Sequence, residues 1–215
     1  MKLLRHYSFL DKICLSVDQA VRALTDNLNS VQSSYPAQHV DEPHLNASQK
    51  KHSAALMRIN HAGEICAQAL YHGQALVSKT QEVQEKMQQS AKEEGEHLAW
   101  CKQRLHELES HTSYLNPLWY VGSFCIGMIA GVAGDKWSLG FVAETEKQVI
   151  KHLEGHLQLL PAQDLRSYTI LQKMEEDESR HRQEAIALGA KDLPDAVKKC
   201  MAFTSKVMVK TAYWV

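Results

Sequence analysis

Two Glu-x-x-His units are the residues in this chain best suited to chemistry: Glu94 to His97, and Glu178 to His181. Positions i and i+3 of a helix share one face, so each unit can direct a carboxylate and an imidazole toward the same point. Together these groups form a ligand set for a divalent metal ion. One such unit is common by chance, whereas two in one chain indicate a repeated metal-binding arrangement.

A further glutamate precedes each unit at a similar distance. Glu64 lies 30 residues before Glu94, and Glu146 lies 32 residues before Glu178. Di-iron carboxylate bundles take one Glu from each of two helices and Glu-x-x-His from each of the other two. The spacing therefore predicts a four-helix bundle whose metal ligands, which are also its catalytic residues, are Glu64, Glu94, His97, Glu146, Glu178 and His181.

The helical phase of these acids supports the assignment. Glu94, Glu146 and Glu178 each interrupt an apolar stripe, and a lone buried carboxylate is costly unless a partner or a metal ion accompanies it. The neighbouring acids Glu96 and Glu144 point roughly away from their stripes. Glu64 is the least distinct of the set, because its helix is apolar on several sides. Taken singly, any of these glutamates could equally be a salt-bridged residue.

The donor set bears on which metal is bound. Four carboxylates and two imidazoles form a hard oxygen and nitrogen set, which favours iron or manganese over zinc. Two divalent ions would balance four carboxylate charges, which makes burial tolerable. One histidine per metal leaves coordination positions open for oxygen. These residues alone leave iron and manganese both open.

The elements that must position these residues are helices. Long stretches show helical periodicity without sustained alternation, which predicts an all-α chain. Ser33, Ser34, Pro36 and Pro43 indicate a linker after the first helix. We expect a single domain with its core at about 48–190, an N-terminal helix and linker over 1–47, and an amphipathic C-terminal helix over 191–215. The helices are expected near 8–31, 48–78, 82–109, 137–160, 163–188 and 192–214, with an apolar, glycine-rich segment at 112–134.

Composition narrows the class of protein. The net charge of -1, without a basic tract interleaved with aromatics, argues against a nucleic-acid partner. Five cysteines lie far apart without a CxxC pair, which is typical of a reducing compartment. The basic N-terminus is interrupted by Asp11 and Lys12, so no signal peptide is expected.

Four segments resemble the demethoxyubiquinol hydroxylase family, which consists of ferritin-like di-iron monooxygenases of ubiquinone biosynthesis. They are NHAGE (60–64), EEGEH (93–97), the segment 116–149 and MEEDESRH (174–181), and the likeness runs from about 54 to 190. The resemblance implies the same six ligands for two Fe2+ ions per chain. It also implies O2 as co-substrate and a 3-demethoxyubiquinol 3-hydroxylase reaction on a prenylated benzoquinol ring.

The resemblance carries further expectations about the site. Members of the family can use NADH as reductant, but this chain has no Gly-x-Gly-x-x-Gly after a strand, so NADH would act directly or through a partner. His152 matches a family histidine yet lies off the ligand stripe. We expect His152 and Tyr71 to support the ligands or contact substrate. The competing interpretation of His152 and His156 is an ordinary solvated or packing histidine.

A prenylated substrate raises the question of the membrane. No charged residue occurs over 112–134, and the C-terminal helix mixes lysines with aromatics. We expect a peripheral protein inserted at the cytoplasmic surface of the cell membrane in a bacterium, with Trp119 and Tyr120 at the interface. The alternatives are a buried bundle helix, or a subunit interface through Gly127-x-x-x-Gly131. A homo-oligomer and other ubiquinone-biosynthesis proteins are further partners to consider.

Three other functions compete with the hydroxylase. A membrane quinol oxidase could use the same ligands to reduce O2 without inserting oxygen into the ring. An iron-storage or ferroxidase shell fits less well with a doubled Glu-x-x-His and an apolar glycine-rich segment. A helical scaffold with incidental carboxylates predicts that Glu178→Ala leaves activity intact.

Overall fold

The computed structural model describes residues 9–25 and 34–215. The helices are α1 (Phe9–Thr25), α2 (Ala47–Val77), α3 (Gln81–Glu107), α4 (Asn116–Val132), α5 (Asp135–Leu159), α6 (Leu165–Ala187) and α7 (Asp195–Ala212). No strand occurs over these two ranges, so the all-α prediction is confirmed. Of the helix expected near 8–31, residues 8 and 26–31 lie outside the described residues, as does Ser33.

Local side-chain bonds explain where the long helices begin. Asn46 and Gln49 form a capping box at the start of α2, each side chain accepting from the backbone N–H of the other. The hydroxyl of Thr80 accepts from the Val83 N–H at the start of α3. Asp164 caps α6 in the same way. These caps satisfy N–H groups that lack a partner within the helix, and so fix each helix's register.

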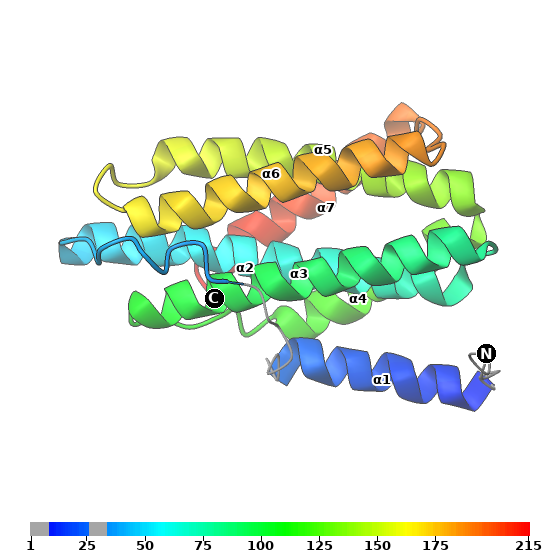
Figure 1. Cartoon of the computed structure of the whole chain (residues 1–215), viewed down its shortest axis with the longest axis horizontal. Coiled ribbons are helices and arrows are strands. Elements are labelled where there is room, and N and C mark those ends of the chain that lie inside the picture. Colours follow the sequence, from blue (N-terminus) through cyan, green and yellow to red (C-terminus); the bar gives the residue numbers. More distant parts are fainter. Residues whose placement is uncertain (1–8, 26–33) are drawn as a thin grey trace.

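Four helices form the bundle, and they come as two hairpins. A short turn joins α2 to α3, another joins α5 to α6, and the four helices run side by side (Figure 1). The connection between the hairpins contains α4, which is the longer crossover expected from the sequence. Gly134, at φ +115°, allows the sharp turn from α4 into α5, a backbone conformation that other residues rarely adopt. The two halves of the predicted ligand set therefore face one another.

The apolar segment becomes α4 and packs against α2. A Cβ atom on Gly127 would lie 2.3 Å from the Leu70 carbonyl oxygen, and one on Gly73 would lie 2.3 Å from the Phe124 carbonyl oxygen. Glycine at these two positions lets the helix backbones touch. The Gly127-x-x-x-Gly131 face is thus used within the chain. The opposite face of α4 exposes apolar side chains, namely Leu118, Val121, Ile129 and Val132.

The terminal segments cover the bundle's sides. Ala23 of α1 is buried against the α2 and α4 side, and α7 buries Met208 and Ala212 against α2. The guanidinium of Arg58 donates to the Tyr213 carbonyl and so ties down the end of α7. The predicted linker, where it is described, also packs on the bundle, since Ala37 is fully buried there. These segments close the core around the helices that hold the candidate site.

Candidate metal centre

One buried glutamate from each bundle helix lies at the same level of the core. Glu64 is on α2, Glu94 on α3, Glu146 on α5 and Glu178 on α6, and none is more than 3% exposed. Apolar layers enclose this level along the bundle axis. One layer includes Met57, Cys101, Leu153, Leu171 and Met174, and the other includes Tyr71, Met87, Leu139, Val142 and Ala185. The sequence therefore brings four carboxylates into a space that water does not reach.

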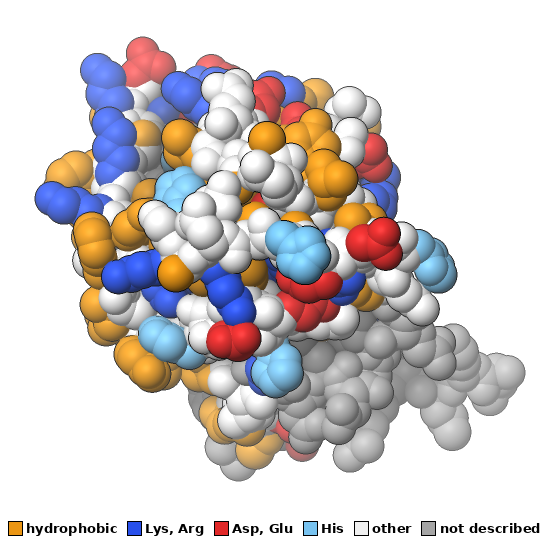
Figure 2. Space-filling view, turned by 90° about the vertical axis from the view of Figure 1, so that its left-hand side faces the viewer, with side chains coloured by type: hydrophobic (Ala, Val, Ile, Leu, Met, Phe, Trp, Pro, Cys, Tyr) orange, Lys and Arg blue, Asp and Glu red, His pale blue; other side chains and the backbone are white. Residues whose placement is uncertain are grey.

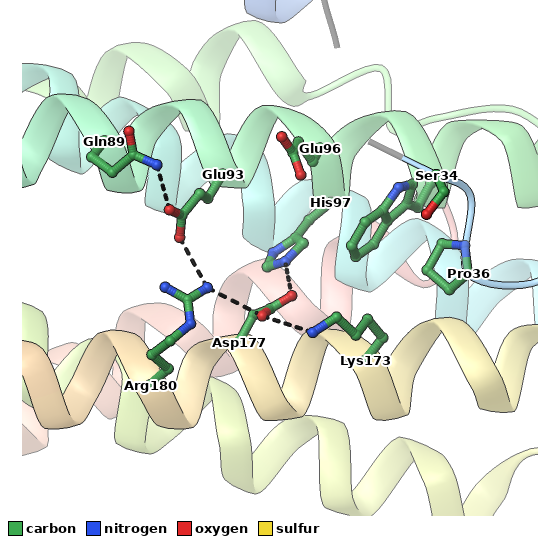
Figure 3. Close-up of a pocket in the computed structure, with 10 residues that line it drawn as sticks. Ser34, Pro36, Gln89, Glu93, Glu96, His97, Lys173, Asp177 and Arg180 are labelled. Atoms are coloured by element: carbon green, nitrogen blue, oxygen red, sulfur yellow. Dashed lines mark hydrogen bonds and ion pairs between the residues drawn. The ribbon is translucent and has the colours of Figure 1, made fainter. Parts of the chain in front are cut away.

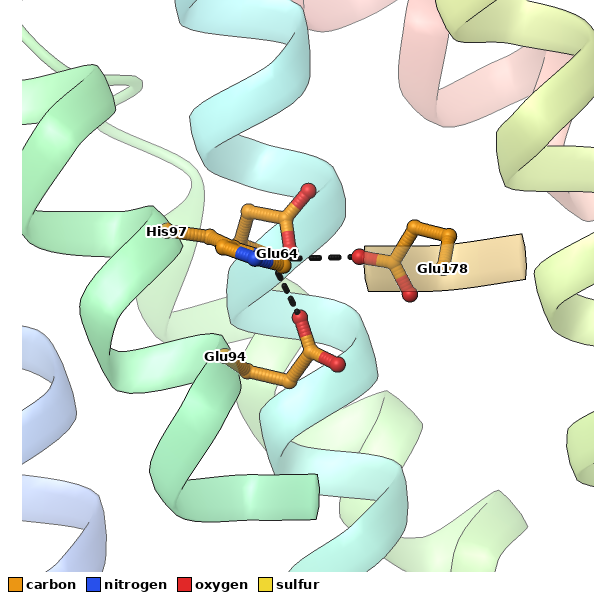
Figure 4. A group of neighbouring side chains, drawn as sticks. All are labelled: Glu64, Glu94, His97 and Glu178. Carbon is orange, nitrogen blue, oxygen red and sulfur yellow. Dashed lines mark hydrogen bonds and ion pairs between the residues drawn. The ribbon is translucent and has the colours of Figure 1, made fainter. Parts of the chain in front are cut away.

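His97 presents its Nδ1 atom to three of these carboxylates (Figure 4). Nδ1 lies 3.1 Å from Glu178 Oε1, 3.2 Å from Glu94 Oε2 and 3.4 Å from Glu64 Oε2. A single N–H cannot donate well to three oxygens. Two ligands at right angles, each about 2.1 Å from a small divalent cation, are about 3 Å apart. The spacing is that of atoms arranged around a common cation.

His181 repeats the arrangement on the other side of the cluster. Its Nδ1 atom lies 3.1 Å from Glu178 Oε2 and 3.3 Å from Glu94 Oε1. The ligand atoms therefore divide into two groups, each lying within 4.8 Å of one another. One group is Glu64, Glu94, His97 and Glu178, and the other is Glu94, Glu146, Glu178 and His181. Glu94 and Glu178 belong to both, as carboxylates that bridge two metal ions would.

The protein alone does not supply hydrogen-bond partners for every carboxylate oxygen of the cluster. Glu94 Oε1, Glu146 Oε2 and Glu178 Oε1 are buried and accept no hydrogen bond from any described residue. A buried carboxylate without partners is strongly disfavoured. Two divalent cations would satisfy these oxygens and balance the four negative charges. The donor set therefore fits a pair of iron or manganese ions.

Burial raises the pKa of Glu64 well above its usual value, and the charge of Glu94 adds to that effect. Burial, together with Glu178, also raises the pKa of Glu146. At Glu94, the nearby imidazoles of His181 and His97 outweigh burial and hold the pKa well below its usual value. The nearby carboxylates of Glu178, Glu93 and Glu94 likewise outweigh burial at His181 and raise its pKa to about 12. Metal binding would require each imidazole to be deprotonated at the nitrogen that binds the ion.

Tyr71 and His152 occupy different positions relative to the cluster. Tyr71, two helical turns after Glu64, is buried, and its hydroxyl donates to Glu146 Oε1. His152 is half-buried on another side of α5, where burial, and then Lys151, lower its pKa. Its neighbour His156 is buried, with Nδ1 2.9 Å from Asn60 Oδ1. Tyr71 is thus in contact with a predicted ligand, whereas a role for His152 stays a prediction.

Two acids next to the predicted ligands were not expected from the sequence. Glu93 Oε2 lies 2.5 Å from His181 Nε2, and Asp177 Oδ2 lies 3.5 Å from His97 Nε2. The available signal was an acid directly before the glutamate of each Glu-x-x-His unit. These acids line a solvent-facing pocket of about 370 Å³ between α3 and α6, which His97 borders (Figure 3).

The two residues expected at the membrane interface, Trp119 and Tyr120, differ in exposure. The prediction that Tyr120 lies at a membrane interface is wrong, because its side chain is only 2% exposed. The Tyr120 hydroxyl lies 2.8 Å from His72 Nδ1 in the protein interior. Trp119 is half-buried. Apolar side chains are exposed instead on the outer face of α4, at Phe203 of α7, and at Trp214 just after α7 ends. Among the described residues, no helix is both long and apolar enough to cross a bilayer.

Unlike the outer face of α4, the end of the bundle near the α5–α6 connection exposes many charged side chains. Figure 2 shows basic, acidic and histidine side chains there, interspersed with apolar ones.

Comparison with known proteins agrees with the geometry. A 3-demethoxyubiquinol 3-hydroxylase of Acinetobacter baumannii is 54% identical over 98% of this chain and all of its own length. One from Nitrosococcus oceani is 50% identical over 98% of this chain and 99% of its own. A dodecameric thioferritin from Bacteroides fragilis shares the fold, with a TM-score of 0.55 and 18% identity over 64% of this chain and 84% of its own.

A model of the family described as ubiquinone biosynthesis protein COQ7 matches residues 51–212. That range contains α3, α4, α5 and α6 whole, α2 from residue 51 onward, and every residue of the buried cluster. This chain is therefore a member of the COQ7 family.

Proposed function

We propose that this chain is a 3-demethoxyubiquinol 3-hydroxylase that inserts one oxygen atom of O2 into the ring of a prenylated demethoxyubiquinol. The observation that carries the proposal is the buried cluster of four glutamates and two histidines, which two divalent cations would complete. The relatives with that activity in their names cover nearly the whole chain. The ring C–H becomes C–OH, the second oxygen atom leaves as water, and two electrons and two protons are consumed.

The residues that would hold the metal are Glu64, Glu94, His97, Glu146, Glu178 and His181. Two ferrous ions, when bound, supply the electrons that activate O2. Glu94 and Glu178 would bridge the ions, while each histidine and each remaining glutamate would bind one ion. Iron rather than manganese is favoured because the proposed reaction requires the metal to give up electrons to O2.

The protein's own contribution is positioning and exclusion of water. The apolar layers on both sides of the cluster keep bulk water from the reacting groups. The Tyr71 hydroxyl donates to Glu146 Oε1 and so restricts how that carboxylate can turn. We propose that His152 acts on the substrate side, at the α5 surface next to His156.

A two-electron reductant must restore the site after each turnover. Reduced nicotinamide (NADH) is the proposed donor, acting directly or through a partner protein. A prenylated quinol is dissolved in the bilayer, so the enzyme must reach the membrane surface. We propose that the exposed apolar face of α4 and the end of α7 lie in that surface, on the cytoplasmic side. Release from membranes by alkaline carbonate without detergent is the expected behaviour.

The test is a single-turnover reaction. Purified protein is loaded anaerobically with ferrous iron, mixed with a short-tailed demethoxyubiquinol and then exposed to O2, and the product is weighed by mass spectrometry. Gain of one oxygen atom, lost in Glu178→Gln, is expected. Consumption of O2 with oxidation of the quinol to quinone alone would overturn the proposal in favour of a quinol oxidase.

A further inference from the structure

In both halves of the bundle, the residue before the glutamate of the Glu-x-x-His unit is acidic. Glu93 precedes Glu94, and Asp177 precedes Glu178, so each half contains the pattern acid-Glu-x-x-His. Neighbouring residues on a helix point in directions about 100° apart, so neither acid can face the same point as its glutamate. Each acid lies instead at the α3–α6 boundary, at the rim of the solvent-facing pocket.

The two acids cross between the helices. Glu93 of α3 contacts His181 of α6, with 2.5 Å between Oε2 and Nε2. Asp177 of α6 contacts His97 of α3, with 3.5 Å between Oδ2 and Nε2. In both histidines Nε2 faces an outer carboxylate while Nδ1 faces the buried cluster. A carboxylate at Nε2 places a proton there and leaves the Nδ1 lone pair for a metal ion.

Arg180 connects the two crossed pairs. One nitrogen of its guanidinium, Nη2, lies 3.1 Å from Glu93 Oε2 and 3.1 Å from Asp177 Oδ1 (Figure 3). Outer side chains bind the same acids, since Lys173 Nζ lies 3.0 Å from Asp177 Oδ1 and Gln89 Nε2 lies 2.5 Å from Glu93 Oε1. The acids are therefore held from the solvent side, and their charges are matched by Lys173 and Arg180. Because Lys173 and Arg180 already balance the charges of the two acids, the acids are poor ligands for a further cation.

An ordinary surface ion pair would not explain this geometry. Exposed pairs contribute little to stability, and the side chain of Arg180 is 44% exposed. The acids, however, are mostly buried, and each reaches a histidine that is at most 1% exposed. Both contacts also join the same two helices. What they fix is the orientation of the two imidazoles and the separation of α3 and α6 at the cluster.

We propose that Glu93 and Asp177 are positioning residues, each of which orients the metal-binding histidine of the opposite helix, and that Arg180 couples the two. The inference rests on the proposed metal site. Asp177 acts on the ion bound by Glu64, Glu94, His97 and Glu178. Glu93 acts on the ion bound by Glu94, Glu146, Glu178 and His181. Arg180 acts on both ions through the two acids.

The first experiment measures metal affinity with cobalt(II), which is stable in air and gives a visible absorption spectrum. The variants are Glu93→Gln, Asp177→Asn and Arg180→Gln. The matched control is Glu96→Gln, because Glu96 lines the same pocket yet makes no hydrogen bond or ion pair in the described part of the chain. Each acid variant is expected to bind one of its two cobalt ions about 10- to 100-fold more weakly. Arg180→Gln is expected to weaken both.

The second experiment tests the crossing itself. In a His97→Ala background only the ion at His181 remains, so Glu93→Gln is expected to weaken its binding and Asp177→Asn to leave it unchanged. In a His181→Ala background the two effects exchange. A loss no greater than that of Glu96→Gln, or a loss from Asp177→Asn that persists without His97, would overturn the proposal. Circular dichroism melting of the metal-free variants checks that all are folded.

The outcomes separate this inference from the proposed function. Wild-type protein that binds two cobalt ions with the crossed pattern, but forms no hydroxylated quinol, would contradict the hydroxylase proposal alone. Wild-type protein that forms the hydroxylated quinol, while the acid variants bind cobalt as the control does, would contradict the positioning proposal alone.

Discussion

Two buried charged clusters on α3 differ in how they are satisfied. Arg104 is fully buried, and each of its guanidinium nitrogens donates to a partner in the chain. Nε donates to Ser167, Nη1 to Glu42 and Glu107, and Nη2 to Asp164. The glutamate–histidine cluster, which includes Glu94 earlier on the same helix, has three carboxylate oxygens that accept no hydrogen bond from any described residue.

The difference shows how a structural cluster can be told from a binding site. Around Arg104 the opposite charges come from the chain itself, so folding completes the cluster. Around Glu94 the chain supplies four carboxylates and two histidines, and completion would take cations from outside. Arg104 and Asp164 are as deeply buried as the glutamates of the other cluster. What separates them is the balance of charge, because Asp164 Oδ2 in the Arg104 cluster also lacks a hydrogen-bond partner, yet its carboxylate faces a guanidinium of the same chain.

The largest effect is expected from the loss of Glu178, a carboxylate that belongs to both ligand groups. Glu178→Gln is expected to lose bound metal and at least about 100-fold of the hydroxylase activity. The metal-free variant should be about 1–3 kcal/mol more stable than the metal-free wild type, because one buried negative charge is gone. Iron analysis, turnover assays and urea unfolding of metal-free protein measure these quantities. Full activity with the same stabilisation would mean a scaffold with incidental carboxylates.

Removal of an acid from the Arg104 cluster should act in the opposite direction on stability. Asp164→Ala leaves the buried guanidinium short of an opposite charge and removes the cap of α6, so a loss of about 3–5 kcal/mol is expected. Metal binding per folded chain should not change. Glu42→Gln is the control, since Glu42 is half-exposed and its loss should cost about 1 kcal/mol or less. Equal losses in both variants would count against the comparison.

A smaller effect is expected where the protein already supplies a partner to the ligand cluster. Tyr71→Phe removes the hydroxyl that donates to Glu146 and should weaken metal binding about 10-fold without displacing either ion. Cobalt titration measures the affinity. An unchanged affinity would show that the Tyr71 hydroxyl does not orient Glu146.

The smallest effect concerns a buried group that stays neutral. Burial, then the charges of His152 and His52, lowers the pKa of His156 to about 4, against 6.5 in the unfolded chain. Between these values the unfolded state binds more protons than the folded state, so stability falls as pH drops from 6.5 to 4. His156→Gln should reduce that slope by about 1 kcal/mol per pH unit. Unfolding curves across this range would show an unchanged slope if His156 were charged in the folded protein.

The sequence predicted what depends on local helical geometry. The six candidate ligands follow from i,i+3 spacing and from carboxylates that interrupt apolar stripes, and the structure places all six together. Glu96 and Glu144 were set aside on phase, and neither joins the cluster. The approximate helix bounds followed from periodicity and from the positions of proline and glycine.

Contacts between helices were not accessible from the sequence. Glu93 and Asp177 contact histidines across the α3–α6 boundary, and no pattern within one helix identifies the partner on another. Tyr120 was expected at a membrane interface because its segment is apolar, but the rotation of α4 on α2 turns it into the core. That rotation is set by the close approach of Gly127 to Leu70, which is a tertiary contact.

The central claim is that the glutamate–histidine cluster requires two divalent cations, and iron stoichiometry tests it most directly. Metal-free protein would be dialysed anaerobically against ferrous iron, and bound iron would be counted per chain by mass spectrometry. Two ions per chain in the wild type, with a loss of binding in Glu178→Gln, is the predicted result. One ion or none in the wild type, or two ions retained in the variant, would contradict the account.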